Sequence, residues 1–221
     1  MDPTPNPPRA PAVLVVGAGD ATGGAIARRF AREGLAACVV RRHLERRRPR
    51  VERIESTIGP IEAMVFNIGA NVPESILAET ARKYFKVGER ACRAGFLSAR
   101  EVARRMVARG RGTIVFTGAT ASLRGSANFA AFSGAKMALR ALAQSMAREL
   151  GPRGLHVAHV VIDGAIDTDF IRERFPARYA LKAQDGILDP DHIADAYWML
   201  HAQPRDAWTH ELDLRPWSEK F

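Results

Sequence analysis

Short apolar runs, rich in β-branched residues, recur along the chain and are separated by longer stretches with helical spacing. Apolar runs of this kind are typical of parallel strands that are buried on both faces of a sheet. They predict strands at residues 12–16, 35–40, 63–66, 113–117, 157–162 and 209–214.

The stretches between these runs predict helices. In residues 23–34, for example, Ile26 and Phe30 fall on one face at the spacing of an amphipathic helix. Gly151, followed by proline, ends the helix expected at residues 132–150. Further helices are expected at residues 51–58, 79–109 (with a break near Gly88) and 191–201.

The alternation of strands and helices predicts an α/β fold built on a Rossmann-like, doubly wound parallel sheet. No linker divides the chain, so residues 12–221 are expected to form a single domain. Residues 1–11 contain five prolines and no apolar segment of the signal-peptide kind. They are expected to be a disordered lead-in to a cytoplasmic protein. No apolar run approaches the ~18 residues that a membrane span needs.

The chain is strongly basic, with a formal net charge of +9. Such a charge attracts nucleic acid, an anionic membrane or a phosphorylated cofactor. Arginines are densest in residues 41–50, but no aromatic side chains alternate with them to stack on bases. This argues against a nucleic-acid partner. Cys38 and Cys92 have no neighbours at metal-ligand spacing, and the histidines form no cluster, so no metal is expected.

Glycines follow the first predicted strand and open the first predicted helix. Gly17, Gly19 and Gly23 allow a tight turn, and the helix N-terminus offers free N–H groups to an anion such as a diphosphate. A strand-to-helix turn without a ligand also uses glycine. The spacing resembles the cofactor loop of short-chain dehydrogenases/reductases, with Gly17 and Gly23 at its outer glycines and Ala21 at the middle one.

Three later segments continue the resemblance in the same order. Asn67 to Ala70 is similar to the family's Asn-Ala-Gly segment, and Phe132 to Lys136 stands where the family has Tyr, three residues and Lys. Asp163-Gly164 with Thr168 resembles the Pro-Gly…Thr segment that touches the nicotinamide. The resemblance therefore implies a cofactor site formed by Gly17, Gly19, Asp20, Ala21, Thr22, Gly23, Arg41, Arg42, Asn67, Gly69, Lys136, Gly164 and Thr168.

The chain departs from the family at the catalytic positions. The resemblance implies a tyrosine that exchanges a proton with the substrate, a serine thirteen residues earlier, and an asparagine on the preceding long helix. Here these positions hold Phe132, Ala119 and Ala91, and only Lys136 is kept. Lys136 is expected to bind the nicotinamide ribose; the alternative is a solvated helix lysine. Thr120, Ser122 and Ser133 are nearby hydroxyls, but they are poor acids without help, and they are expected to be cap or turn residues instead of replacements.

A second departure lies between Gly34 and Asn67. The family has an additional helix and strand there, and this chain passes from the second predicted strand directly into the arginine-rich run. The family's third strand, at the sheet edge, is therefore expected to be missing, together with the segment that flanks adenine.

The resulting expectation is an oxidoreductase that transfers hydride to or from a carbonyl, an alcohol or an activated double bond. Arg41 and Arg42 follow the second strand, where arginine favours the 2′-phosphate, so NADP(H) is expected and NAD(H) is the alternative. The alternative interpretation of the arginine-rich run is an exposed, solvated loop. Because three catalytic positions are altered, a non-catalytic cofactor-binding or scaffold protein (a pseudoenzyme) remains the alternative function.

Two expectations concern partners. The substrate pocket is expected to be apolar, from Phe170, Phe175, Tyr179, Leu181 and Ile187. A homodimer or homotetramer is expected, since the helix at 132–150 carries more apolar surface than one core-facing stripe needs. The alternative is a helix that the monomer covers entirely. The surplus surface is assigned to Ala135, Ala138, Leu139, Leu142 and Met146.

Overall fold

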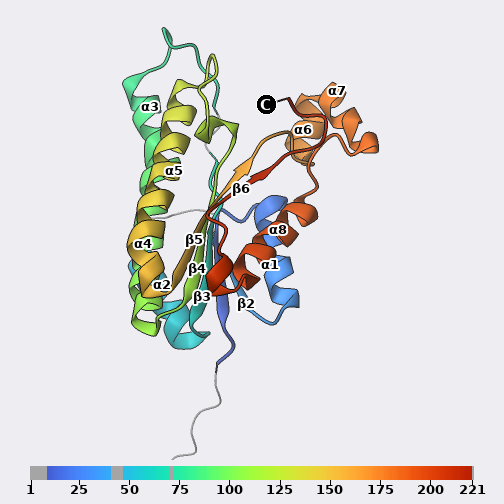
Figure 1. Cartoon of the computed structure of the whole chain (residues 1–221). Coiled ribbons are helices and arrows are strands. Elements are labelled where there is room, and N and C mark those ends of the chain that lie inside the picture. The colour runs from blue at the N-terminus through green and yellow to red at the C-terminus, as the bar shows by residue number, and fades with distance from the viewer. Residues whose placement is uncertain (1–8, 41–46, 70–71, 221) are drawn as a thin grey trace, which may run out of the picture.

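The structure, a computed structural model, describes residues 9–40, 47–69 and 72–220 (Figure 1). Within these ranges, six parallel strands form one sheet in the order β2-β1-β3-β4-β5-β6. This confirms the Rossmann-like prediction, and each strand lies within two residues of its expected bounds. The strands are β1 (Ala12–Val16), β2 (Ala36–Val40), β3 (Ile61–Phe66), β4 (Gly112–Thr117), β5 (Leu155–Ile162) and β6 (Glu211–Leu214).

Helices cover both faces of the sheet, as Figure 1 shows. Side chains alternate between the two faces along each strand: Leu14 and Met64 join one buried cluster, and Val13 and Val65 join the other. The first cluster packs under α2 (Arg47–Thr57), α4 (Ala94–Arg109) and α5 (Ala130–Leu150). The second packs under α1 (Thr22–Arg32) and α8 (Pro190–Ala202).

Strand β2 is the edge of the sheet in the described part of the chain, since its only ladder partner there is β1. The expected loss of the family's edge strand is thus confirmed for these residues. After β2 the description resumes at Arg47, where α2 begins. Arg41 and Arg42 lie outside the described residues.

The break expected near Gly88 is absent, and a π turn stands in its place. Helix α3 (Ala81–Gly88) continues into a π-helical turn, Glu89–Arg93, and then into α4. A π turn widens a helix locally and is frequent near functional sites. Ala91 lies in this turn and is fully buried against Ala131 and Ala135 of α5.

Short helices that the sequence pattern did not predict follow Thr168. They are too short for a hydrophobic period to show. Thr168 caps the first of them, because its Oγ1 accepts a hydrogen bond from Ile171 N at 3.2 Å. The short elements after Thr168 are α6 (Asp169–Arg174), α7 (Pro176–Tyr179) and the 3₁₀ turns Ala180–Gln184 and Arg205–Ala207. Two further 3₁₀ turns, Thr120–Ser122 and Gly151–Arg153, precede Thr168.

Residues 9–11, expected to belong to the lead-in, lie against the body of the protein. Pro11 O accepts a hydrogen bond from Ala36 N at 2.8 Å, and Ala10 O fills the space beside Gly59. The first eight residues lie outside the described ranges. None of the described helices combines the length and the apolar character that crossing a bilayer requires.

Candidate functional site

A cavity of about 690 Å³ opens where the carboxyl ends of β3, β4 and β5 meet. In an open parallel sheet this is the edge where ligands bind. Its wall includes Asn67 and Gly69 after β3, Ala119 after β4, and Gly164 after β5. Thr22, from the start of α1, lines it as well. The structure therefore brings together residues from all four segments of the resemblance.

The glycine loop lies against the residue after β3. Gly17 has φ +94°, and a Cβ there would lie 2.5 Å from Asn67 O. A Cβ on Gly23 would lie 2.6 Å from Gly17 O, so a side chain at either position would displace backbone. Gly19, in contrast, faces open space within 4 Å. Neighbouring backbone thus fills the space beside Gly17 and Gly23, and the space beside Gly19 is empty.

The N-terminus of α1 is suited to an anion. Its N-cap, Ala21, supplies no side-chain hydrogen bond, and the first turn holds no acidic residue. Its backbone N–H groups and the positive end of the helix dipole thus face the loop without a competing carboxylate in that turn. Asn67 holds the loop in place, since its Nδ2 donates to Gly17 O at 3.3 Å.

Lys136 is buried at the bottom of the cavity. It is only 2% exposed, and its Nζ donates to Thr117 O at 2.7 Å and to Ile68 O at 3.2 Å. Burial lowers the pKa of Lys136 to about 8. These contacts rule out the alternative of a solvated helix lysine. Two of its three N–H donors bind the protein, which leaves one for a ligand.

Of the three altered positions, two line the cavity and the third lies outside it. Phe132 lines the cavity, with Lys136 Nζ 5.8 Å from its ring centroid. Ala119 lines it too, and its backbone N–H donates to Ser122 Oγ at 3.1 Å. Ala91 is enclosed in the π turn, outside the cavity wall.

No tyrosine of the chain lines this cavity, and all three lie within the described residues. Tyr84 is 44% exposed and packs over Gly134. Tyr179 lines a neighbouring cavity. Tyr197 is fully buried in the α8 layer, where its hydroxyl shares a hydrogen bond of 2.7 Å with Thr117 Oγ1. No phenol can therefore take over the role that Phe132 lacks.

A buried carboxylate lines the cavity, and the sequence did not single it out. Asp163 is 1% exposed and accepts a hydrogen bond from Thr120 Oγ1. Its Oδ2 has no hydrogen bond among the described residues, and Arg124 Nη2 lies 3.8 Å from it. The one available signal was the aspartate in place of proline before Gly164.

A second cavity of about 630 Å³ adjoins the other side of the glycine loop. Asp20, Ala21 and Thr168 line it, so these predicted residues face this space and not the wall around Lys136. Charged side chains dominate its remaining wall, including Lys182, which pairs with Asp167 at 2.6 Å. No group of three or more metal-ligating side chains gathers in the described part of the chain.

The residues expected to form an apolar substrate pocket are dispersed. Phe170 and Tyr179 line the second cavity, and Ile187 is buried. Phe175 and Leu181 are exposed. The wall around Lys136 instead carries four charged residues besides the lysine: Arg124, Asp163, Arg178 and Glu219. The wall around Lys136 thus mixes charged side chains with apolar ones such as Ile68, Phe129 and Ile162, and the rings after Thr168, with the short helices that carry them, lie elsewhere.

Comparison with known proteins places this architecture in a family. The family model described as short chain dehydrogenase matches residues 46–178, more than half of the chain. A short-chain dehydrogenase from Rhodopseudomonas palustris, known from its crystal structure, is 40% identical, with a TM-score of 0.77. The match covers 94% of this chain and 99% of that one.

Curated relatives match over shorter stretches. The 3-oxoacyl-[acyl-carrier-protein] reductase MabA of Mycobacterium avium is 30% identical over 119 residues, 54% of this chain and 46% of that protein. The 3-oxoacyl-[acyl-carrier-protein] reductase FabG of Escherichia coli is 27% identical over 122 residues, 55% of this chain and 50% of that protein. The chain spans about half the length of these relatives. Together, the family model and the solved structure show that the chain belongs to the short-chain dehydrogenase family, oxidoreductases that bind NAD(P)(H).

Proposed function

We propose that the protein binds NADP(H) in the cavity above Lys136 and acts as an oxidoreductase on a carbonyl, an alcohol or an activated double bond. The observation that carries this proposal is the glycine loop, closed against Asn67 and open at Gly19, next to a buried lysine. The bound cofactor would supply or accept the hydride. The chain's own residues would bind it, orient it and handle the proton.

The residues present fit a dinucleotide. Gly19 leaves room for a diphosphate to approach the backbone, and the start of α1 at Thr22 offers N–H donors to its charge. The remaining N–H of Lys136 is suited to a ribose hydroxyl. All of these groups are preformed, because none needs a rearrangement to face the ligand.

The preference for NADP(H) over NAD(H) rests on Arg41 and Arg42, which follow β2 in the sequence. Arginine at this point of the fold favours the 2′-phosphate, and an acidic residue would favour the unmodified ribose. Replacing both arginines by alanine should weaken NADPH binding more than NADH binding.

The relatives suggest where to look for a substrate. Two of them are named as reductases of 3-oxoacyl groups on an acyl carrier protein. A 3-oxoacyl thioester therefore belongs in the first panel, beside simple ketones, aldehydes, quinones and enones. The charged wall formed by Arg124, Arg178 and Glu219 favours a substrate with polar groups near the reacting carbon.

A second function, binding of the cofactor without catalysis, is favoured by one specific observation. Phe132 and Ala119 line the cavity where the family's acid and its hydroxyl donor are expected, and neither can donate a side-chain hydrogen bond. A scaffold or sensor would need only the loop and Lys136.

Single-turnover kinetics separates the two functions. The protein, in excess over NADPH, is mixed with each member of the panel, and the loss of NADPH absorbance is followed. An oxidoreductase consumes the bound NADPH with at least one substrate. Binding without consumption across the panel would favour the non-catalytic function.

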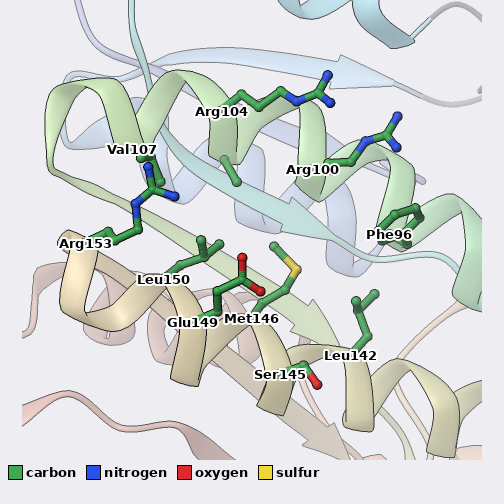
Figure 2. A pocket seen from close by; sticks show the side chains of 11 residues that line it. Phe96, Arg100, Arg104, Val107, Leu142, Ser145, Met146, Glu149, Leu150 and Arg153 are labelled. Atoms are coloured by element: carbon green, nitrogen blue, oxygen red, sulfur yellow. The ribbon is translucent and has the colours of Figure 1, made fainter.

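We also propose that a second copy of the chain covers the face formed by α4 and α5. A groove of about 460 Å³ lies between these helices. In Figure 2, Phe96 and Val107 line one wall of it, and Leu142 and Met146 line the other. Arginines and Glu149 surround this apolar strip. Both signs of charge are thus present on one face, as a twofold interface needs, and the family is commonly oligomeric.

A further inference from the structure

The Thr120–Asp163 pair occupies a defined place in the fold. Thr117 of β4 lies opposite Val160 of β5 in the ladder, and Thr120 and Asp163 follow these two residues at the same offset. Both therefore lie at the carboxyl ends of neighbouring parallel strands, where ligands bind. Both also line the cavity that contains Lys136.

One oxygen of the Asp163 carboxylate accepts no hydrogen bond from the described residues. Thr120 Oγ1 donates to Asp163 Oδ1, while Oδ2 is buried without a hydrogen bond. The guanidinium of Arg124, at 3.8 Å, is near enough to interact by charge and too far for a hydrogen bond. A buried oxygen without a donor loses the hydrogen bonds that water would give it, which costs stability. Such a cost is common at sites built for a ligand or for a proton.

The cavity needs a group that exchanges a proton with the substrate. Phe132 cannot do so, and no tyrosine lines the wall. A threonine hydroxyl alone is too weak an acid or base. A hydroxyl whose proton already points at a carboxylate can pass a proton on, in the way that an adjacent base activates a nucleophile.

We propose that Thr120 and Asp163 are the catalytic pair that moves the substrate proton in this site. In alcohol oxidation, the O–H bond of the substrate breaks and its proton goes to Thr120 Oγ1, as the proton of Thr120 moves to Asp163 Oδ1. The hydride of the same carbon leaves to the oxidised nicotinamide, and the alcohol becomes a carbonyl. Carbonyl reduction runs through the same transfers in reverse.

This inference rests on the proposed oxidoreductase function and narrows its substrate class. A pair that exchanges a proton with oxygen serves the interconversion of alcohols and carbonyls. Reduction of an activated double bond would instead require a proton donor to carbon. The proposed pair thus favours alcohols and carbonyl compounds, 3-oxoacyl groups included, over enones.

The test compares Asp163→Asn, Thr120→Val and Thr120→Ser with the parent protein. Asp206→Asn, on the exposed turn Arg205–Ala207, is the matched control for loss of a carboxylate. For each protein, NADPH affinity is measured by fluorescence titration and folding by thermal unfolding. Single-turnover hydride transfer to the best ketone of the panel is then measured between pH 5 and pH 9, in H₂O and in D₂O.

We expect Asp163→Asn and Thr120→Val to slow hydride transfer by ~10² to 10⁴-fold, the usual contribution of acid–base catalysis. The variant that combines Asp163→Asn with Thr120→Val should be little slower than either single variant, because the two residues act as one unit. Thr120→Ser should retain most of the rate, and NADPH affinity should stay within about twofold. The parent's solvent isotope effect should disappear in Asp163→Asn.

A spectroscopic readout follows the transferred proton itself. After a single turnover of the bound alcohol with NADP⁺, the infrared difference spectrum should show a protonated carboxyl band that Asp163→Asn lacks. Parent-like rates and isotope effects in both variants, or the absence of that band, would overturn the inference. NADPH binding without hydride transfer across the panel would instead overturn the proposed oxidoreductase function on which the inference rests. Failure of the parent to bind NADPH or NADH would overturn the proposed cofactor site as well.

Discussion

At the scale of single residues, the site is defined by one retained and several altered side chains. Lys136 was predicted from the resemblance to the family's Tyr, three residues and Lys segment, and the structure places it in the cavity. Asp163 could not be predicted as a partner of Thr120, because a fold brings together residues 43 positions apart. A sequence motif can show which residues are neighbours on one helix or strand. To predict that residues after two different strands meet, one must also know the register in which those strands pair.

The family's tyrosine-dependent reaction should be absent from the parent protein, and its loss should be local. Phe132→Tyr with Ala119→Ser restores the phenol and the hydroxyl donor at the cavity wall. Made in the Thr120→Val protein, which lacks the proposed Thr120–Asp163 pair, these two substitutions should raise the reduction of generic aldehydes and quinones by ~10²-fold or more. NADPH affinity should be unchanged, because the glycine loop and Lys136 are intact. Equal rates for Thr120→Val with and without the two substitutions, measured with NADPH in excess, would contradict this assignment.

At the scale of elements, the hydrophobic pattern predicted the strands and the long helices, since each buries a regular stripe. It could not predict the short helices after Thr168, which have no room for a period. It predicted a break near Gly88, where the helix instead continues through a π turn, because the extra residue of such a turn shifts the hydrophobic period much as a break does.

The contact between β5, β6 and α5 contains a buried histidine that should make stability depend on pH. His159 is fully buried, with Nδ1 3.2 Å from Glu211 Oε2, and Arg140 binds the same carboxylate at 2.6 Å. Burial lowers the pKa of His159 to about 4. An unfolded histidine takes up a proton near pH 6.5 and the folded one near pH 4, so stability is lost as pH falls between these values.

We expect the free energy of unfolding to fall by on the order of 2 to 3 kcal/mol from pH 7 to pH 4 through His159. His159→Gln should remove most of this part of the slope, and His192→Gln, at an exposed position of α8, should not change it. Urea unfolding of each protein at half-unit pH steps measures the pH dependence of the free energy of unfolding. Equal slopes in the parent and His159→Gln would show that another group is responsible. Burial also lowers the pKa values of His156 and His201, which should leave a residual slope.

At the scale of the whole molecule, the two helical layers differ. Helix α8 packs under its own sheet face, while α4 and α5 leave an apolar groove at the surface (Figure 2). Of the five residues assigned to the surplus surface, Ala135 and Leu139 are buried within the monomer. Ala138 is exposed, and Leu142 and Met146 are half-buried. The expected apolar surface is therefore smaller than the sequence implied, and it is continued by Phe96 of α4.

Self-association should depend on this groove. Leu142→Glu with Met146→Glu places two negative charges in its apolar wall and should convert the protein to a monomer at micromolar concentration. Met199→Glu, on the exposed surface of α8, is the matched control and should leave the assembly intact. Light scattering coupled to size-exclusion chromatography gives the masses. A monomeric parent protein would refute the proposed interface.

The central claim is that the loop around Gly19 holds NADP(H), and direct titration tests it. NADPH and NADH are titrated by fluorescence into the parent, into Gly19→Glu and into Gly151→Glu, since both glycines face open space and neither has a positive φ. We predict saturable binding to the parent, tighter for NADPH. Gly19→Glu should lose at least tenfold in affinity by charge repulsion of the diphosphate, and Gly151→Glu should bind like the parent. No binding of either nucleotide to the parent, or equal binding to Gly19→Glu, would contradict the claim.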